Sequence, residues 1–574
     1  MKYSLVNKNL TENYGENLLK ERGVNDVKRF LNPDKSCIQS PSDLDNIDKA
    51  AELLIQVINK DEKILIVVDS DCDGFTSATI IYQYIKKIKN NIEIDYLLHE
   101  GKQHGLEDHI DTLLEKGIEY GLVILPDSSS NDFGYHEQLK GVHIPVLVLD
   151  HHLTDVELSN NAVVVNNQLS EKYLNKELTG AGVVYQFCRY LDSKLGLDFA
   201  DYFMDLAAWG IIGDMGGMLS LENRYIVKNG LSNINNFFFK VLIDKQSYSM
   251  NDKVNPITVA FYIVPLINAM IRVGTMEEKE RLFMAFIDGT KKVPSNKRGA
   301  KGTEELIAVE SARECTNARN RQNKIKDNAV EKLEIKIHKH GLLDNKVLFV
   351  RLDDEDDFPA VLNGLVAMQL SAKFKKPTIV ARLNDEGYVR GSARGLNESE
   401  LNDFKTFLSD SGYFEYTLGH ANAFGCSISN RNLFDFHNYA NEHLKDIDFG
   451  ENIYDVNIIR NAADKDLSNI ILDFSKYSDI WGQQNPEPLI FIDNVNLNKS
   501  DIQIIGKTKD TVKFDKFGIT YIQFHAKQLI EDLNKYPSVK LQIIGRANLN
   551  EWGGREIPQI FIENYEVFDG EYSF

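Results

Sequence analysis

Residues 64–74 read Ile-Leu-Ile-Val-Val-Asp-Ser-Asp-Cys-Asp-Gly, and this stretch decides the fold that the sequence predicts. Its first five residues are all aliphatic, which is the composition of a buried strand. Asp69, Asp71 and Asp73 follow at alternate positions, and in an extended chain they project from the same side. So much negative charge at the end of a buried strand predicts a site for a divalent cation.

A solvated acidic turn and a calcium-binding loop are alternative interpretations of the same three acids. An EF-hand loop begins Asp-x-Asp-x-Asp-Gly, but it needs a Glu at its twelfth position and a helix before it. Here the twelfth position is Ile80 and the preceding segment reads as a strand, so a calcium loop is disfavoured. The acidic turn stays open as long as this segment is considered alone.

Two more apolar runs downstream end in residues of metal-ligand type. Leu122 to Leu125 leads to an Asp at 127, and Val146 to Leu149 leads to Asp-His-His at 150–152. In an open parallel sheet the carboxyl ends of the strands line one crevice, where such folds bind ligands. A further acid follows a helix-like apolar stretch, between glycines. The candidate metal ligands are therefore Asp69, Asp71, Asp73, Asp127, Asp150, His151 and Asp214.

The order of these motifs resembles that of the DHH phosphoesterase superfamily, and more narrowly that of RecJ-type single-strand-specific exonucleases. The resemblance extends over nearly the whole chain, because further segments follow in the family's order. They are a glycine turn (Leu178–Val183), the fourth motif (Asp205–Arg224), a Pro-x-x-Asn-Ala helix (Pro265–Ala269), two accessory-domain signatures (Gly391–Arg394 and Gly419-His420) and the start of the last domain (Asn485–Pro488). Motifs in the same order over this length are more specific than any one of them.

Apolar runs that alternate with helical patterns, together with this resemblance, predict an α/β protein of several domains. The length of 574 residues agrees with that number of cores. The expected parts are an N-terminal extension packed on the core (1–45), a parallel-sheet DHH domain (46–235), a helical connector (236–335), a second α/β domain of the DHHA1 type (336–449) and a C-terminal OB-fold β-barrel of short strands (450–574).

An oxygen-rich donor set with one imidazole favours two Mn²⁺ or Mg²⁺ ions over zinc. Two such ions, roughly 3.5–4 Å apart, supply a nucleophile at neutral pH and neutralise charge on a phosphodiester. The expected ligands of the first ion are Asp71 and Asp127, and those of the second are Asp73, Asp127, His151 and Asp214. Asp127, shared by both ions, is the central catalytic carboxylate. Asp69 and Asp150 either bind an ion directly or support a residue that does.

His152 is expected to point away from His151 on an extended chain. By resemblance it contacts the scissile phosphate or protonates the leaving 3′ oxygen, and the alternative is a packed core histidine. The resemblance also implies that four residues hold the terminal phosphate. They are Arg272 on the helical segment, Ser392 and Arg394 on a glycine turn, and His420. His99 stands where the family has an arginine, so we expect a weaker phosphate contact there.

The formal net charge of −20 is unusual for a nucleic-acid enzyme, because phosphate binding normally leaves a basic footprint. The segment 291–301 is an exception, since it is basic, flexible and poor in acids. The helix-like stretch after it carries Arg313, Arg319, Arg321, Lys324 and Lys326. These cations either guide a strand into the crevice or form a solvated basic face. Trp481 and Trp552 in the last domain either stack on bases or belong to its core.

The resemblance implies a metal-dependent 5′-to-3′ exonuclease that degrades single-stranded DNA to mononucleotides in DNA repair or recombination. RNA is an alternative substrate, and a helicase or single-strand-binding protein is the partner expected by analogy. Two other functions stay open. One is a DHH-family phosphodiesterase that acts on short RNA or small nucleotides. The other is a non-catalytic replication scaffold, although such scaffolds lose metal ligands that this chain keeps.

We expect a monomeric cytoplasmic enzyme that does not enter a membrane. The composition, with 43% hydrophobic and 26% charged residues, is that of a large globular protein. The polar start lacks the apolar centre of a signal peptide, and the longest apolar stretch, Ala260 to Ile271, is too short to span a bilayer. The five cysteines form no CxxC pair and read as reduced thiols.

Overall fold

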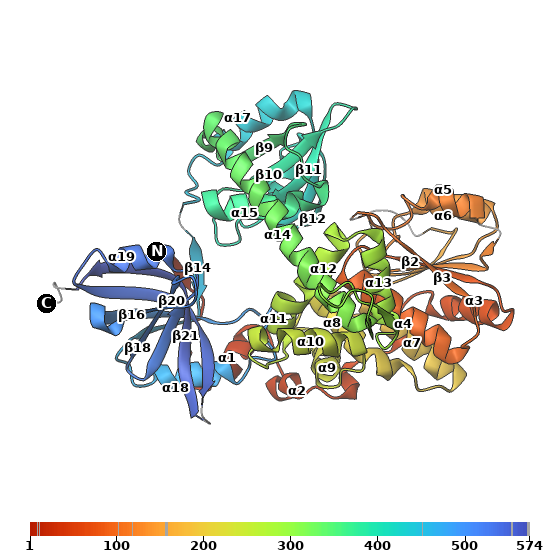
Figure 1. Ribbon diagram of the computed structural model, residues 1–574, viewed down its shortest axis with the longest axis horizontal. Coiled ribbons are helices and arrows are strands. Elements are labelled where there is room, and N and C mark those ends of the chain that lie inside the picture. Colours follow the sequence, from red (N-terminus) through yellow and green to blue (C-terminus); the bar gives the residue numbers. More distant parts are fainter. Residues whose placement is uncertain are drawn as a thin grey trace. The chain divides into compact units, whose positions relative to one another are not determined.

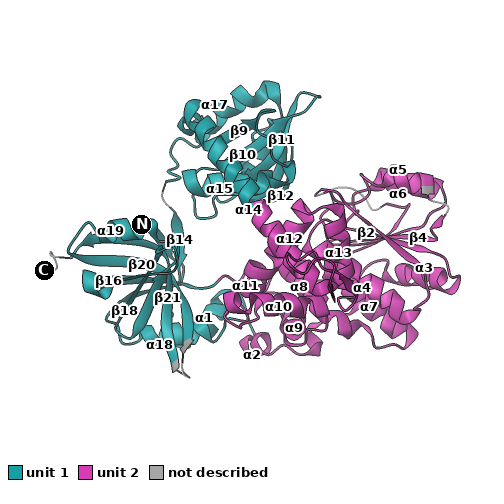
Figure 2. Ribbon diagram, viewed as in Figure 1, with its two compact units in different colours: residues 1–25, 323–478, 487–574 teal, residues 26–322, 479–486 magenta. Residues whose placement is uncertain are grey.

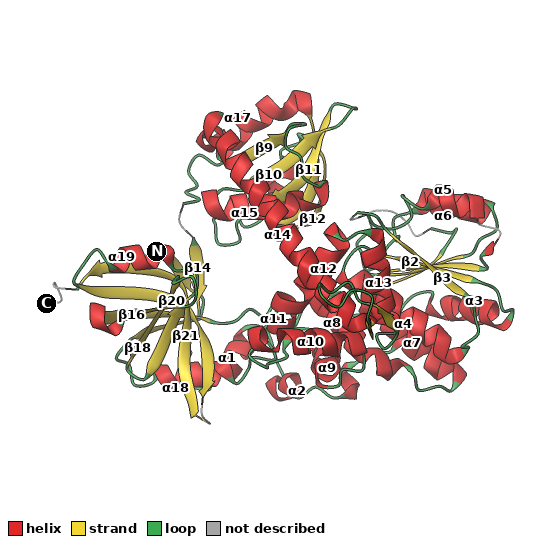
Figure 3. Cartoon of the chain, viewed as in Figure 1, coloured by secondary structure: helices red, strands yellow, loops and turns green. Residues whose placement is uncertain are grey.

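The computed structural model describes residues 1–7, 10, 12–101, 103–116, 119–154, 159–450, 452–552 and 555–570 (Figure 1). They form two compact units, and the chain passes between these more than once (Figure 2). Unit 2 comprises residues 26–322 and 479–486, and unit 1 comprises residues 1–25, 323–478 and 487–574. Both units combine sheets with helices (Figure 3), which confirms the predicted α/β class.

Unit 2 is built around five parallel strands in the order β3-β2-β4-β5-β6. They are β2 (Ile64–Val68), β3 (Ile94–Leu98), β4 (Leu122–Pro126), β5 (Val146–Asp150) and β6 (Val163–Asn166). Alternate residues of β2 enter two different cores, with Ile64 and Ile66 on one face and Leu65 and Val67 on the other. A strand that is buried on both faces is apolar throughout, and this unbroken apolar run is the signal from which the sequence predicts β2.

Helices connect these strands and cover both faces of the sheet, as expected of βαβ units. The connecting helices are α4 (Cys72–Ile88), α5 (Ile110–Lys116) and α6 (Phe133–Gly141). The larger core also takes in α3 (Ile47–Asn59), α7 (Gly180–Leu195), α8 (Met204–Gly213), α9 (Leu221–Ser232), α10 (Phe237–Met250) and α13 (Met276–Ile287). Helices α4, α7 and α8 pack against one another and carry much of the site described below.

One segment of unit 2, Pro256–Val273, is long and apolar enough to cross a membrane by length and composition. It consists of α11 (Pro256–Thr258), a π-helical turn η5 (Val259–Ile263) and α12 (Val264–Val273). Half of the segment is buried within the protein, and its residues Ile263 and Ile267 belong to the larger core. In this structure the segment is therefore a core helix of unit 2.

The predicted basic segment lies in an antiparallel hairpin of unit 2, formed by β7 (Lys292–Pro294) and β8 (Glu304–Leu306). A hydrogen-bonded hairpin thus replaces the expected flexible segment. Helix α14 (Ile307–Lys339) follows directly and runs from unit 2 into unit 1. Its 33 residues make a helix of about 50 Å.

The second α/β domain, in unit 1, has five strands in the order β12-β13-β11-β10-β9. Strands β9 (Leu348–Leu352) and β10 (Thr378–Leu383) are parallel and are connected through α15 (Asn363–Phe374). The remaining strands are antiparallel, namely β11 (Tyr388–Arg394), β12 (Phe414–His420) and β13 (Ala423–Ser429). Helices α16 (Phe404–Asp410) and α17 (Leu433–His443) contribute to one core with this sheet.

The C-terminal part of unit 1 is a seven-stranded sheet in the order β15-β16-β20-β21-β19-β18-β17. Short strands make up much of this sheet, as expected, but β20 (Ser538–Trp552) and β21 (Arg555–Asp569) have 15 residues each. The other strands are β15 (Ile458–Asn461), β16 (Leu489–Asn498), β17 (Gln503–Ile505), β18 (Thr511–Lys516) and β19 (Ile519–Gln523).

Two segments depart from the predicted domain order. Strand β1 (Lys2–Leu5) pairs in parallel with β14 (Ile453–Val456), so residues 1–25 belong to unit 1 and not to the DHH core. Conversely, residues 479–486 fold with unit 2, where Arg224 donates from Nη1 to the Asp479 carbonyl oxygen at 2.7 Å. Both pairings join parts that are far apart in the sequence, so no local pattern announces them.

Candidate functional site

The three acids of the opening stretch do not lie along one extended strand. Asp69 follows β2, but Asp71 is the N-cap of α4 and Asp73 lies in the first turn of that helix. The predicted alternation along an extended chain is therefore wrong. The start of the helix still gathers the carboxylates, because oxygens of Asp69, Asp71 and Asp127 lie within 4.8 Å of one another.

Asp73 is buried against the N-terminus of α7. Its Oδ2 accepts a hydrogen bond from Gly180 N at 2.8 Å, and its Oδ1 accepts one from Ala181 N at 3.0 Å. Burial and the negative charge of Asp71 raise the pKa of Asp73 to about 7, against the effect of these donors. A Cβ on Gly210 would lie 2.2 Å from Asp73 Oδ1, so glycine is needed where α8 passes this carboxylate.

Asp127 follows β4 in the left-handed backbone region, with φ 67°, which is unusual for a residue with a side chain. Its side chain is buried, and its Oδ1 accepts no hydrogen bond from any residue that the structure describes. Burial, followed by the charge of Asp73 and other nearby acids, raises the pKa of Asp127. A Cβ on Gly180 would lie 2.2 Å from Asp127 Oδ1, so this glycine leaves room for the carboxylate.

His151 lies among three carboxylates. Its Nε2 is 3.2 Å from Asp127 Oδ1, 3.5 Å from Asp214 Oδ2 and 4.0 Å from Asp73 Oδ2. Asp214 is the C-cap of α8, and its side chain is 34% exposed, whereas Asp73 and Asp127 are buried. One imidazole nitrogen and three carboxylates from four different elements thus converge on one point.

Asp150 and His152 form a hydrogen-bonded pair beside this point. The rings of His151 and His152 have centroids 4.5 Å apart, so the prediction that His152 points the opposite way is wrong. His152 Nδ1 lies 2.7 Å from Asp150 Oδ1, and Asp150 also accepts hydrogen bonds from His151 N at 2.7 Å and from Ser130 N at 3.0 Å. Because these donors occupy both oxygens, the geometry favours a supporting role for Asp150.

The charges of this pair stabilise each other. Burial alone would raise the pKa of Asp150, but the positive charge of His152 holds it below its usual range. Asp150 in turn raises the pKa of His152 to about 10. The His152 side chain is 51% exposed, so the ring is accessible from solvent and is not the packed core histidine of the alternative prediction.

The sequence analysis missed His104, which pairs with Asp69. His104 Nδ1 lies 2.6 Å from Asp69 Oδ2, while Asp69 Oδ1 is buried and accepts no hydrogen bond from the described residues. Burial raises the pKa of Asp69, and the charge of His104 opposes that shift. Asn268, which belongs to the expected Pro-x-x-Asn-Ala helix, makes a contact that was not predicted: its Oδ1 accepts from Cys72 N at 3.0 Å and so holds the first turn of α4. Neither contact has a sequence spacing that could have predicted it.

These residues fit a site for divalent cations. Two buried carboxylate oxygens, Asp69 Oδ1 and Asp127 Oδ1, have no hydrogen-bond donor among the described residues, which is costly without a cation. Three groups of potential ligands lie within 4.8 Å. These groups are Asp69, Asp71 and Asp127; Asp73, His151 and Asp214; and Asp127, Asp150, His151 and His152. Carboxylates with one or two imidazoles match the preferences of Mn²⁺ and Mg²⁺.

Arg272, on α12, lies close enough to Asp71 for the two charges to interact. Burial lowers the pKa of Arg272, the charge of Asp71 raises it, and Arg319 on α14 lowers it further. Neither arginine forms an ion pair with a residue in the described part of the chain. Two guanidinium groups are therefore left for an anionic ligand beside the acids.

His99 lies in a different setting from the one predicted. It is 3% exposed, and its ring lies beside that of His109, tilted by 37° at a centroid distance of 4.5 Å. Neither ring nitrogen of His99 has a hydrogen-bond partner among the described residues. Burial lowers the pKa of His99 to about 3, so the ring is neutral. A buried neutral ring cannot make the phosphate contact that we expected of this residue in this conformation.

Ser392, Arg394 and His420 lie on one face of the accessory sheet. Ser392 and Arg394 belong to strand β11 and not to the predicted glycine turn. Arg394 and His420 both pair with Ala423, from the two sides of β13, so their side chains project from the same face. Ser392, two residues before Arg394, shares that face. The structure thus gathers these three predicted residues within unit 1.

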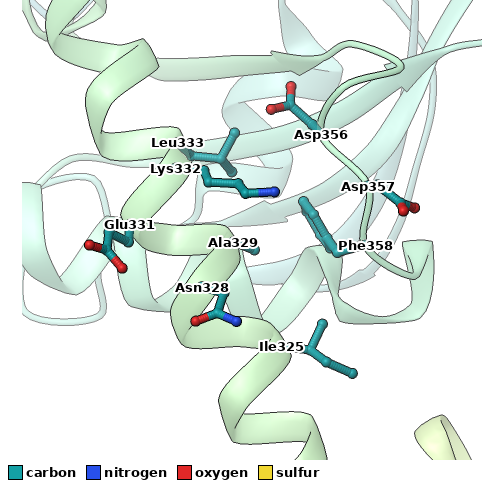
Figure 4. Close-up of a pocket in the computed structure, with 9 residues that line it drawn as sticks. All are labelled: Ile325, Asn328, Ala329, Glu331, Lys332, Leu333, Asp356, Asp357 and Phe358. Carbon is teal, nitrogen blue, oxygen red and sulfur yellow. The ribbon is translucent and has the colours of Figure 1, made fainter.

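The structure describes only one of the two tryptophan side chains that were expected either to stack on bases or to belong to a core. Trp481 is 3% exposed, which disfavours stacking on bases, but it lies in unit 2 and not in the core of the last domain as the alternative held. The side chain of Trp552 lies outside the described residues. A pocket in unit 1 lies between α14 and the loop after β9 (Figure 4). Its charged residues are mostly acidic, and none of the predicted site residues lines it. This pocket is a poor site for a nucleic acid strand.

A parallel sheet that presents acids and an Asp-His-His triplet at one edge defines a DHH-type phosphoesterase domain, and comparisons agree. Residues 63–211 match the DHH family, N-terminal domain, and residues 463–564 match the RecJ OB domain. The chain is 39% identical over 558 residues to the putative SPbeta prophage-derived single-strand DNA-specific exonuclease YorK of Bacillus subtilis strain 168, a match that covers 96% of this chain and 95% of the relative. The chain therefore belongs to the RecJ family.

Other relatives extend this result. The single-stranded-DNA-specific exonuclease RecJ of Bacillus subtilis strain 168 is 26% identical over 569 residues, which cover 96% of this chain and 67% of the relative. The crystal structure of RecJ in complex with Mn²⁺ from Thermus thermophilus matches with a TM-score of 0.73 and 18% identity, over 98% of this chain and 79% of that one. The structural match shows that the two proteins share a fold.

Proposed function

We propose that this protein is a metal-dependent exonuclease that hydrolyses single-stranded DNA to mononucleotides from the 5′ end. The observation that carries the proposal is the convergence of His151 Nε2 with Asp73, Asp127 and Asp214, in a chain whose relatives are named single-strand DNA-specific exonucleases. A non-catalytic scaffold would not need to retain this set of ligands. The long α14 and the two added domains also favour a strand over a small nucleotide as substrate.

The residues that would hold two Mn²⁺ or Mg²⁺ ions are Asp71, Asp73, Asp127, His151 and Asp214, with Asp69 beside the first ion. When bound, the ions activate water for attack on phosphorus and neutralise charge on the phosphate. Solved structures of RecJ with Mn²⁺ and with Mg²⁺ support this choice of metals. The protein buries the Asp73 and Asp127 carboxylates, fixing Asp73 through backbone donors and leaving room for both at glycines.

His152 is the residue best suited to handle a proton at the substrate. Asp150 accepts the hydrogen bond of Nδ1 and fixes the ring, which leaves Nε2 as the atom that can face the substrate. From there Nε2 can donate to a phosphate oxygen or to the leaving 3′ oxygen. The half-exposed ring is compatible with a strand that enters from solvent.

Selection of a strand end is assigned to the arginines and to the accessory domain. Arg272 carries positive charge near Asp71, and Arg319 adds a second positive charge near Arg272, so the pair suits a phosphate next to the cleaved bond. Ser392, Arg394 and His420 offer one positive and two polar groups on one sheet face, suited to a terminal phosphate. The 5′-to-3′ direction rests on the resemblance of these residues to the family's signatures.

We further propose that the protein works as a cytoplasmic monomer in DNA repair or recombination. A helicase or a single-strand-binding protein would supply its substrate strand. These points rest on analogy with the family. Gel filtration with light scattering tests the first of them, and a mass of one chain is the expected result.

Strands labelled at either end test the proposed direction. The protein should release labelled mononucleotide at once from a 5′-labelled DNA strand and only late from a 3′-labelled one. The same strand made of RNA should be degraded more slowly. Early release from the 3′ label would contradict the proposed polarity, and faster cleavage of RNA would contradict the proposed substrate.

A further inference from the structure

The β7–β8 hairpin has a tip of defined backbone conformation. Ser295 N donates to the Thr303 carbonyl oxygen at 2.8 Å, and Gly302 N donates to the Ser295 carbonyl oxygen at 2.8 Å. Gly299 and Gly302 have φ values of 87° and 81°, which a residue with a side chain rarely adopts. Residues 295–303, which we call the hairpin tip, therefore form a closed turn.

The base of the hairpin is anchored on α14 by ion pairs. Arg313 Nη2 contacts Glu305 Oε1 at 2.6 Å and also pairs with Glu310, whose side chain is buried. Glu310 Oε2 in turn accepts a hydrogen bond from Asn296 N at 3.2 Å. Arg313 is thus neutralised by its own neighbours, and Arg321 likewise pairs with Glu278. These two arginines serve the fold and are not free for a ligand.

The cations of the hairpin tip are in the opposite situation. Lys297, Arg298 and Lys301 are exposed, and none forms an ion pair with a residue that the structure describes. The sequence from Pro294 to Thr303 contains no acid. Three uncompensated positive charges on a short turn stand out in a chain with a net charge of −20. Such a concentration favours a polyanionic ligand.

We propose that the hairpin tip binds the phosphate backbone of the single strand away from the cleaved bond, an inference that rests on the proposed function. The tip offers no large apolar side chain, which a protein partner would need as an anchor, but it offers the point charges that a backbone of phosphates attracts. The anchor Arg313 precedes Arg319 by six residues, or about 9 Å along α14. The hairpin is thus anchored on the same helix that carries Arg319.

Binding of fluorescein-labelled oligothymidylate to the full chain, measured by anisotropy in EDTA so that no cleavage occurs, tests the inference. The variant is Lys297→Gln with Arg298→Gln and Lys301→Gln. Its matched control, Lys28→Gln with Lys49→Gln and Lys172→Gln, removes the same charge from exposed positions elsewhere in unit 2. In the hairpin variant, the logarithm of the association constant should depend less steeply on the logarithm of the salt concentration. The magnitude of this slope should decrease by about 2, because three phosphate contacts on a single strand are lost. The control should keep the wild-type slope.

The length of the strand adds a second readout. The loss of affinity should reach about tenfold on a long oligothymidylate and should be smaller on one too short to extend beyond the metal-ligand cluster. Equal salt slopes in the hairpin variant and the control would overturn the inference. Failure of the wild-type protein to cleave single-stranded DNA with Mn²⁺ would instead overturn the proposed function, so the two failures are distinguishable.

Discussion

His104 Nδ1 lies 2.6 Å from Asp69 Oδ2, and this contact orients a carboxylate at the edge of the metal-ligand cluster. The expected role of His104 is therefore to position Asp69. His104→Ala should weaken Mn²⁺ binding and lower kcat by about tenfold, with little change in KM. His104→Asn should restore much of both, because its amide nitrogen can take the place of Nδ1. Mn²⁺ binding followed by electron paramagnetic resonance checks this, and equal loss in both variants would contradict a positioning role.

Gly180 offers a second test, because two carboxylates lie where its side chain would be. A Cβ there would meet Asp127 Oδ1 at 2.2 Å, and the Gly180 N–H binds Asp73. Gly180→Ala should weaken Mn²⁺ binding at least about tenfold. Gly134→Ala is the control, since α6 leaves open space around that glycine and alanine favours a helix. Calorimetric titration with Mn²⁺ compares the affinities of the two variants. Unchanged Mn²⁺ binding by Gly180→Ala would contradict the close approach of this glycine to the carboxylates.

Much of the sheet and of the ligand set could be predicted because both leave local signals. Strands β2, β4 and β5 are apolar on both faces, and their ends carry acids or the Asp-His-His triplet. The conformation of Asp71 and Asp73 could not be read in the same way. An Asp can continue a strand or cap a helix, and here Asp71 begins α4, so that the chain turns at once.

Other features depend on contacts between distant parts of the chain. The pairing of His104 with Asp69, of β1 with β14 and of Asn268 with Cys72 follows from the tertiary fold and has no periodicity in the sequence. Charge composition alone likewise did not distinguish Arg313, which holds the hairpin, from the exposed Lys297 and Arg298. Burial and partners decide between such roles.

The buried His99 and the half-buried His109 beside it predict a loss of stability in acid. Burial lowers the pKa of both, that of His99 to about 3. The unfolded state therefore binds protons first as the pH falls below 6.5, the ordinary value, and the unfolding free energy decreases until the folded pKa is reached. His99 should contribute about 2 kcal/mol of this decrease between pH 6.5 and about pH 5.

Comparison of the wild-type protein with His99→Gln checks this prediction. The variant should lose less stability than the wild type over the same pH interval, whatever its stability at neutral pH. Urea unfolding followed by tryptophan fluorescence suits the measurement, because Trp209 and Trp481 both lie in unit 2 with His99. Parallel pH profiles of the unfolding free energy for the two proteins would mean that folding does not lower the pKa of His99.

We propose that the carboxylates around His151 hold the cations with which the protein cleaves single-stranded DNA. The most direct test measures release of mononucleotides from single-stranded DNA by wild-type protein and by Asp127→Asn, with Mn²⁺ and with EDTA. We expect release by the wild type with Mn²⁺ only, and none by the variant even when circular dichroism shows that it is folded. Release in EDTA, or undiminished release by a folded Asp127→Asn protein, would contradict the proposal.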